Sequence, residues 1–268
     1  MSAARLRSLA LVLAVPCAAL ALGACASKPR INNPVPESPS IKPDPAEAAK
    51  YNVELGIAYM QRGELAVAQE KLERALKEAP RDATVHSALA LLDERLGDPG
   101  AADEEFHKAL HLAPRDPDIS NNYAVYLCRT HRTDEGVKRL LATAHDPLYA
   151  TPEAAYTNAA VCLRNEHRDA EAATELQRAI NLRPNFAEAV FQMADLDIDH
   201  GRYAAARARI DTYIETYVAT PDLLALGVRV ARAMHDPVAE QRYQQRLRVD
   251  FPDSQQTRAY APANPNSG

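Results

Sequence analysis

Residues 52–80 read NVELGIAYMQRGELAVAQEKLERALKEAP, and the same order of residue types returns further down the chain. In this stretch, small, large apolar and turn-forming residues stand at fixed intervals: Asn52, Leu55, Gly56, Tyr59, Gly63, Ala68, Leu72, Ala75 and Pro80. The following stretch carries Leu89, Ala90, Gly97, Ala102, Phe106, Ala109 and Pro114, each 34 residues after its counterpart. A fixed period of this length indicates a repeated structural unit whose copies stack on one another.

The spacing resembles the 34-residue tetratricopeptide repeat, a pair of antiparallel helices. Its small-residue column continues through the chain as Ala68, Ala102, Gly136, Ala172, Ala206 and Ala239. Small residues let the two helices touch, large apolar residues fill the remaining space, and the proline ends the second helix. The predicted repeats are residues 49–82, 83–116, 117–150, 153–186, 187–219 and 220–253, in a domain over 47–255. The resemblance therefore implies an all-α fold, a right-handed superhelix of about six repeats with a concave groove.

The repeats differ in how closely they follow the pattern. The third has His131 in the glycine column, and the fifth and sixth are also degenerate. Two extra residues precede the fourth repeat and fall in the segment Asp146–Pro152, where we expect a longer turn. The composition agrees with a helical chain, because it holds abundant alanine and only 9 glycines in 268 residues.

The first 24 residues have the three parts of a secretory signal. Arg5 and Arg7 precede an apolar stretch over 9–22, and small residues stand before Cys25. This stretch of 14 residues is shorter than the ~20 that a transmembrane helix needs. The segment Leu22–Cys25 resembles the lipobox of bacterial lipoproteins, in which the cysteine is diacylated and becomes the mature N-terminus. Ordinary secretion with an incidental cysteine is the alternative.

The segment after Cys25 has the composition of a tether. Residues 27–45 hold six prolines and neither glycine nor an aromatic residue, so the segment cannot form a core and is expected to be extended. We therefore divide the chain into a signal at 1–24, a lipidated tether at 25–46, the repeat domain, and a disordered tail at 256–268. Ala26 follows the cysteine in place of the aspartate that retains many lipoproteins at the inner membrane, which favours the periplasmic face of the outer membrane by resemblance.

The concave groove is the candidate binding site of such a scaffold. In the first repeat, Val53, Ile57 and Met60 form an apolar stripe at helical spacing, outside the core columns of the repeat pattern. In the second repeat, we expect the groove to be lined by Leu91, Glu94 and Arg95. The alternative for each of these residues is a place in the core. An apolar groove is suited to an amphipathic helix of a partner protein.

Two cysteines remain in the mature domain, Cys128 and Cys162. Each stands near the end of the first helix of its repeat, and first helices of neighbouring repeats pack side by side. A disulfide is therefore expected in an oxidising compartment, and two reduced buried thiols are the alternative.

No pattern in the sequence predicts catalysis, a cofactor or a small-molecule substrate. Asp103, His107 and His111 share a helix face, but no further ligand supports a metal site. Asp195, Asp197 and Asp199 alternate without the glycine and glutamate of a calcium loop. The formal net charge of -5 gives no basic patch for nucleic acid. These observations favour a protein-binding scaffold over an enzyme.

Several segments together are similar to the PilF/PilW family of type IV pilus lipoproteins, the secretin pilotins. They are NNYAVYLC (121–128), DPLYATPEAAYTNAAVC (146–162), FAEAVFQMADL (186–196), LLALGVRVA (223–231) and DFPDS (250–254), preceded by the lipobox. The resemblance implies a lipoprotein, carried by the lipoprotein sorting system to the outer membrane, that promotes localisation and multimerisation of the pilus secretin. It also implies support of pili and twitching motility, and a disulfide between repeats three and four. A repeat lipoprotein that scaffolds barrel-assembly or cell-wall machinery is the alternative.

Overall fold

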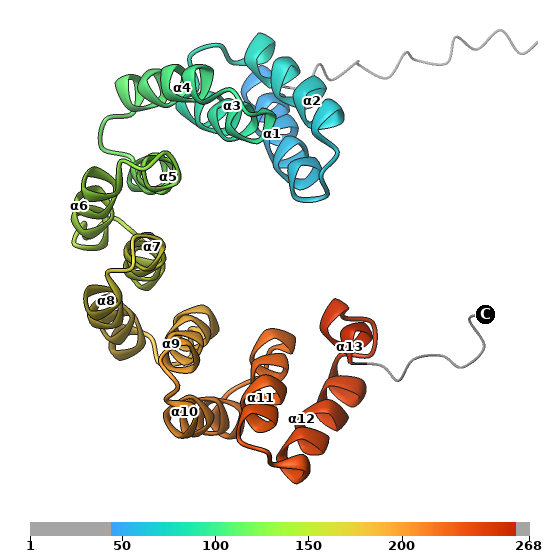
Figure 1. Ribbon diagram of the computed structural model, residues 1–268. Helices are drawn as coiled ribbons and strands as arrows, with labels where there is room; N and C mark the ends of the chain where they lie inside the picture. Colours follow the sequence, from blue (N-terminus) through green and yellow to red (C-terminus); the bar gives the residue numbers. More distant parts are fainter. Residues whose placement is uncertain (1–43, 261–268) are drawn as a thin grey trace, which may run out of the picture. The chain divides into compact units, whose positions relative to one another are not determined.

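The computed structural model describes residues 44–260, which fold entirely as helices and turns (Figure 1). Six helix pairs follow one another along this part of the chain and a short helix ends it. The pairs are α1 (Pro45–Gln61) with α2 (Leu65–Glu78), α3 (Ala83–Leu96) with α4 (Pro99–Leu112), α5 (Pro117–Arg129) with α6 (Thr133–Ala144), α7 (Pro152–Asn165) with α8 (Asp169–Leu182), α9 (Ala187–Asp199) with α10 (Tyr203–Thr216), and α11 (Pro221–Ala233) with α12 (Pro237–Asp250); the last helix is α13 (Gln255–Ala259). The expected all-α repeat fold is confirmed. Within the described range, no helix has the length and apolar character needed to cross a membrane.

Aspartate followed by proline starts several of these helices. The side chains of Asp44, Asp98, Asp116 and Asp236 each accept a hydrogen bond from a backbone N–H in the first turn. Such caps satisfy amide groups that have no partner within the helix, and proline at the first position is already set to a helical φ angle. The dipeptide therefore determines where a helix begins.

The turn between the two helices of each pair contains one residue with a positive φ angle. Glycine fills this position in three repeats (Gly63, Gly97 and Gly201) and histidine in the other three (His131, His167 and His235). The left-handed region is open to glycine and is reached by histidine more often than by most residues. His131 stands where the sequence pattern has glycine. It adopts a φ angle of 62°, so the turn between α5 and α6 has the same backbone conformation as in the repeats with glycine.

The first helices of the repeats form one continuous layer. Each of α1, α3, α5, α7, α9 and α11 contacts the next, and α13 contacts α11. In the described part of the chain, the backbones of the second helices pack against their own partner and the following first helix. Between successive second helices only side chains meet, as where Tyr243 of α12 donates to Asp211 of α10 at 2.6 Å. The second helices therefore diverge on the outside of the curve, and the first helices line its inner side (Figure 1).

Small residues set the distance between the two helices of a pair. Ala68, Ala102, Ala172 and Ala206 are completely buried. A Cβ atom added to Gly56 would lie 2.7 Å from the side chain of Leu72. The large residue of one helix thus occupies the space that the small residue of the other leaves open, which is the packing that the repeat pattern predicts.

Two predicted boundaries differ from the structure. Helix α1 begins at Pro45, inside the predicted tether, because Asp44 caps it. The tail predicted to be disordered from residue 256 is helical up to Ala259, and this part of the prediction was wrong. Thr257 is buried and donates to the carbonyl oxygens of Leu247 and Phe251 at 3.0 and 2.7 Å, so these residues cover the end of the last repeat. Residues 1–43 and 261–268, with the predicted signal, Cys25 and the rest of the tether, lie outside the described residues.

We expect Gly136→Ala to lower the free energy of unfolding by about 1–3 kcal/mol, because overpacking displaces neighbouring atoms. An added Cβ would lie 2.5 Å from Cys128 Sγ and 2.7 Å from the carbonyl oxygen of Ala124. Gly100→Ala is the matched control, since its added Cβ would meet no atom closer than 3.5 Å. Urea denaturation of both variants measures the difference. Equal stability of the two would contradict this account of the packing.

Candidate functional site

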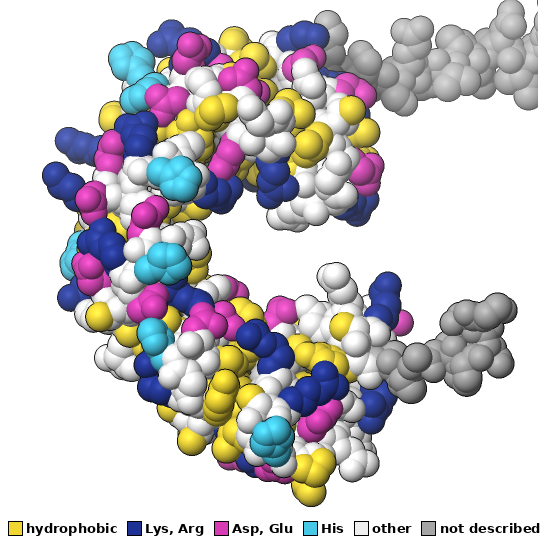
Figure 2. All heavy atoms as spheres, in the orientation of Figure 1, with side chains coloured by type: hydrophobic (Ala, Val, Ile, Leu, Met, Phe, Trp, Pro, Cys, Tyr) yellow, Lys and Arg dark blue, Asp and Glu magenta, His cyan; other side chains and the backbone are white. Residues whose placement is uncertain are grey.

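Each first helix has one face that its own second helix and the neighbouring first helices cover only in part. Helix α5 illustrates this face: Tyr123, Ala124 and Leu127 are buried, whereas Val125 is half-buried and Arg129 is exposed. We call the corresponding surface on α1, α3, α5, α7, α9 and α11 the inner face. It lies on the hollowed side of the molecule in Figure 2.

An apolar row crosses the inner face of the first four repeats. Its members are Ile57, Leu91, Val125 and Val161, separated by 34, 34 and 36 residues, and all four are half-buried. Each comes from the same position of a different helix, so the row runs across the helices. We name these four residues the apolar row.

Side-chain amides lie beside the apolar row and join neighbouring helices. Asn122 Nδ2 donates to Ser87 Oγ at 3.4 Å, and Asn158 Nδ2 donates to Asn121 Oδ1 at 3.1 Å. The residues of the first pair are 35 positions apart and those of the second are 37 apart. The same contact is thus repeated in the next repeat, and the two-residue insertion between repeats three and four accounts for the difference.

Arginine side chains form a second set of contacts between neighbouring first helices. Arg95 Nη1 donates to the carbonyl oxygen of Met60 at 2.8 Å, and Arg129 Nη1 contacts Glu94 Oε2 at 2.9 Å. Both contacts join residues 35 positions apart. Glu94 and Arg95, two of the predicted groove residues, therefore take part in contacts between repeats at one side of the apolar row.

Charged residues replace the apolar row in the last two repeats. Asp195 and Arg229 occupy the next two positions, 34 residues apart, and Arg229 Nη1 contacts Asp195 Oδ1 at 3.0 Å. Arg164 Nη2 contacts Asp195 Oδ2 at 3.0 Å and Asp199 Oδ2 at 2.7 Å. The inner face thus changes from apolar in repeats one to four to an ion-pair network on α7, α9 and α11.

The structure does not place every predicted groove residue on the inner face. Ile57 and Leu91 belong to the apolar row, and their role in binding a partner stays a prediction. Val53 and Met60 are only 5% and 4% exposed, and they lie in the core formed by α1, α2 and α3. Their assignment to the groove was wrong, because both positions face the neighbouring first helix. Val125 and Val161 were missed, although adding the repeat period to Leu91 points to both.

The aspartates that stand close together in the sequence, and His107, have structural partners. Asp195 and Asp199 lie on the inner face, while Asp197 points the opposite way and binds Arg202 Nε at 2.9 Å. Asp103 accepts from the hydroxyl of Tyr123 at 3.2 Å. Burial and the Asp103 carboxylate raise the pKa of Tyr123, so this hydroxyl stays protonated and donates. Among residues 44–260, no three potential ligands are grouped in a way that would hold a metal ion.

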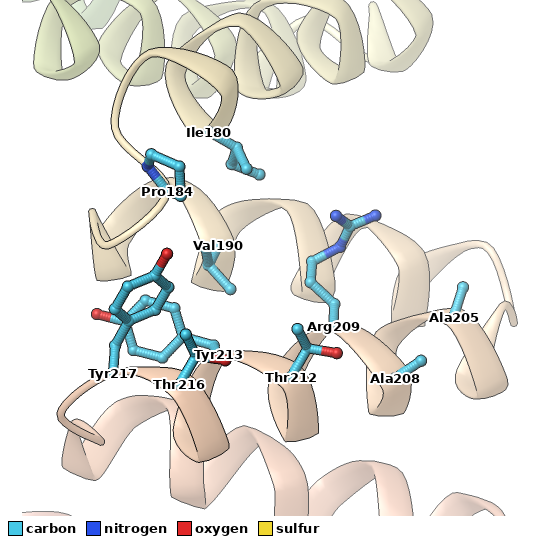
Figure 3. Close-up of a pocket in the computed structure, with 10 residues that line it drawn as sticks. All are labelled: Ile180, Pro184, Val190, Ala205, Ala208, Arg209, Thr212, Tyr213, Thr216 and Tyr217. Atoms are coloured by element: carbon cyan, nitrogen blue, oxygen red, sulfur yellow. The ribbon is translucent and has the colours of Figure 1, made fainter.

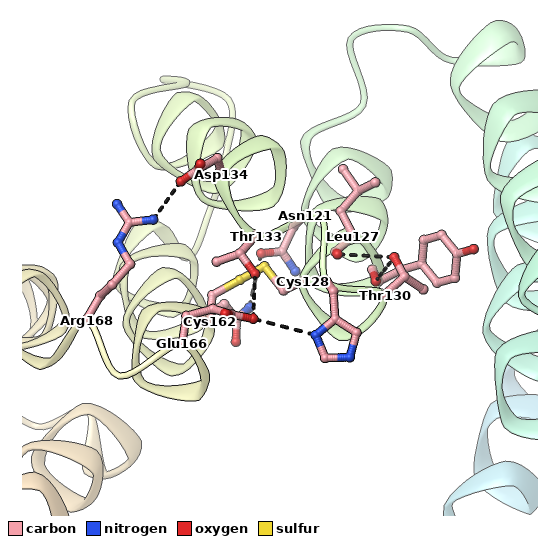
Figure 4. Close-up of a disulfide and its surroundings, with 12 residues drawn as sticks. Asn121, Leu127, Cys128, Thr130, Thr133, Asp134, Cys162, Glu166 and Arg168 are labelled. Atoms are coloured by element: carbon pink, nitrogen blue, oxygen red, sulfur yellow. Dashed lines mark hydrogen bonds and ion pairs between the residues drawn. A yellow bond between two sulfur atoms is a disulfide. The ribbon is translucent and has the colours of Figure 1, made fainter.

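Cys128 and Cys162 form a disulfide between α5 and α7 (Figure 4). Their Cα atoms are 5.6 Å apart, within the usual range for a disulfide. Cys162 is buried, and the bond closes a loop with a sequence separation of 34. The disulfide thus joins repeats three and four covalently.

Known proteins share both the sequence pattern and the fold. A sequence profile of the tetratricopeptide repeat matches residues 53–117. The type IV pilus assembly protein PilF of Pseudomonas aeruginosa is 29% identical over 208 residues, covering 78% of this chain and 82% of that protein. The solved structure of Pseudomonas aeruginosa PilF matches with a TM-score of 0.58 over 81% of this chain and 97% of its own. The structure of PilW, a widely conserved type IV pilus biogenesis factor, matches with a TM-score of 0.60 at 27% identity, over 79% and 97%.

The helix pairs and the profile match define a tetratricopeptide-repeat protein, a scaffold whose binding partners are typically other proteins. The chain is homologous to PilF, and its sequence and structure are consistent with the PilF/PilW family of type IV pilus biogenesis proteins. The family resemblance inferred from the sequence is confirmed.

We expect reduction of the Cys128–Cys162 bond to lower the free energy of unfolding by about 3–4 kcal/mol, because the open chain gains conformational entropy in the unfolded state. Thermal unfolding of the full chain with and without dithiothreitol measures the effect. The variant Cys128→Ser/Cys162→Ser is the control, since dithiothreitol has no bond to break in it. Equal melting temperatures of the oxidised and reduced protein would contradict the expectation.

Proposed function

We propose that the protein is a pilotin: it binds a segment of the type IV pilus secretin on its inner face and promotes localisation and multimerisation of the secretin in the outer membrane. The apolar row carries this proposal. Four half-buried apolar side chains from four successive helices form a surface that water contacts in the free protein and that an apolar partner would cover. The homology to PilF supports the choice of a pilus protein as the partner.

The proposed ligand is an amphipathic helix. Neighbouring packed helices are about 8–10 Å apart, so four members of the row extend over roughly 24–30 Å. A helix rises 1.5 Å per residue, and about 16–20 residues would cover this length. Its apolar side would contact the row, while its polar edges would meet the amides of Asn122 and Asn158 and the guanidinium groups of Arg95 and Arg129.

The proposed role of Cys25 is to attach this scaffold to the outer membrane. Cleavage after residue 24 would leave Cys25 as the lipidated N-terminus, and residues 26–43 would connect it to α1. Two or more acyl chains hold a protein firmly to a bilayer, whereas one chain binds reversibly. The lipoprotein sorting system would then carry the scaffold, with the secretin bound, to the periplasmic face of the outer membrane and so support pili and twitching motility.

We expect Val125→Glu to reduce co-purification of the secretin with the full chain at least tenfold, because the carboxylate would have to be buried against the apolar side of the ligand. Val238→Glu is the matched control, since Val238 is 79% exposed on α12, outside the inner face. The amount of secretin recovered from detergent-solubilised membranes is measured, with the melting temperature of each variant as a check on folding. Recovery of barrel-assembly or cell-wall proteins without secretin would favour the alternative scaffold.

We expect Cys25→Ala to move the protein from the outer-membrane fraction to the soluble or inner-membrane fraction and to reduce secretin multimers on gels. The reason is that the thiol is the proposed site of acylation. Cys25→Ser tests the thiol more narrowly, because it changes only sulfur to oxygen. Normal secretin multimers together with a delocalised protein would contradict lipid-dependent piloting.

A further inference from the structure

A cavity of about 510 Å³ opens between α8 and α10, away from the inner face (Figure 3). Its lining comes from the end of α8, from Val190 of α9 and from one side of α10. Helices α8 and α10 are second helices of neighbouring repeats and do not contact each other. The cavity is therefore part of the open space between these two helices.

Small side chains keep this space open along α10. Ala205, Ala208, Thr212 and Thr216 line it at intervals of three or four residues, so they share one side of the helix, and all four are exposed. The side of α10 that packs in the core holds Ala206, Ile210 and Ile214 instead. A helix lying along α10 could therefore approach it closely.

Large apolar side chains close the other sides of the cavity. Ile180 and Pro184 come from α8 and the turn after it, and Tyr213 and Tyr217 lie at the end of α10 with ring centroids 5.2 Å apart. The hydroxyl of Tyr213 donates to the carbonyl oxygen of Asn185 at 3.0 Å, which holds this ring in place. Tyr217 is 38% exposed. The cavity thus offers a preformed apolar surface of about the size of one or two large side chains.

One guanidinium group in the cavity wall has too few acceptors. Arg209 Nε is buried and has no hydrogen-bond partner among residues 44–260. Arg209 Nη2 lies 3.4 Å from Asp197 Oδ2, a long contact, and Asp197 is bound more closely by Arg202 at 2.9 Å. A guanidinium carries five N–H donors and binds carboxylates best. Arg202 and Arg209 share the single carboxylate of Asp197, so one positive charge is left that a ligand carboxylate could balance at the Arg209 side chain, which is 28% exposed.

From the apolar walls, the small-residue side of α10 and the unmatched charge of Arg209, we infer that the space between α8 and α10 is a second docking site, which binds an amphipathic helix of a partner protein. The helix carries a bulky apolar side chain that fills the cavity and, one turn away, an Asp or Glu that pairs with Arg209. This site is separate from the apolar row, so both can be occupied at once. The inference does not depend on the identity of the ligand on the inner face.

The first experiment identifies the occupant. The photo-crosslinking residue p-benzoylphenylalanine replaces Tyr217, an aromatic residue of the cavity wall, in the full chain in cells that assemble pili, and the crosslinked peptide is sequenced by mass spectrometry. The control carries the same residue in place of Val249, which is 71% exposed on α12 outside the cavity. We expect an adduct from position 217 only, with a helical segment that has a large apolar residue three or four positions from an acidic one. No adduct, an adduct with lipid, or a segment without an acidic residue would overturn the inference.

The second experiment tests the charge pairing with a synthetic peptide of the crosslinked segment. Fluorescence anisotropy gives its Kd for the wild-type chain and for Arg209→Gln, each with the acidic peptide and with its Asn or Gln counterpart. We expect either single change to weaken binding about tenfold, and the second change to add little once the first is made. Independent, additive effects would overturn the pairing.

A further variant separates loss of the site from loss of folding. Thr212→Leu fills the cavity and leaves Arg209 and Asp197 untouched, so it should abolish peptide binding with an unchanged melting temperature. Co-purification of the secretin through the inner face should be unaffected by this variant. Retained peptide binding by a folded Thr212→Leu protein would contradict the proposed position of the ligand.

Discussion

Each helix pair of this protein can bury its apolar side chains only against the pair before it and the pair after it. Between residues 44 and 260, each repeat packs only against the repeat before it and the repeat after it, so stability is a sum of local interfaces. The first and the last repeat of such a stack each lack one neighbouring repeat. At the carboxyl end α13 supplies it, because the buried Thr257 and the hydroxyl of Tyr260, bonded to the Ala225 carbonyl oxygen at 3.4 Å, cover α11 and α12. The short helix is thus part of the fold.

The sequence predicted the fold well because the same few contacts recur at a constant period. Ala68 and its counterparts, the large residues opposite them and the caps at helix starts can each be identified without a structure. It was harder to predict whether an apolar residue of a first helix faces the neighbouring repeat or the inner face. Val53 and Met60 have the same apolar character as Ile57, and only the packing of α1 against α3 separates the buried pair from the half-buried residue. The cavity beside α10 depends on the divergence of two helices that never touch, which no local pattern encodes.

Polar contacts between the first helices keep the inner face in register. The rows of amide and arginine contacts repeat with the period of the fold, and they satisfy polar groups that would otherwise compete for water or ligand. The apolar row therefore lies between polar groups that already have partners, and its surface is available for binding. At the cavity beside α10, Arg209 Nε lacks a partner, and the helix proposed for that site therefore carries an acidic residue.

The disulfide also determines how the chain responds to mechanical force. A stack of repeats that is pulled at its two ends comes apart pair by pair, and each released pair lengthens the chain. The residues between Cys128 and Cys162 cannot contribute, because the covalent bond transmits the tension across the loop. At about 3.5 Å per extended residue, a loop with a sequence separation of 34 withholds roughly 120 Å of extension. The middle of the scaffold would thus stay short under a load that unravels either end.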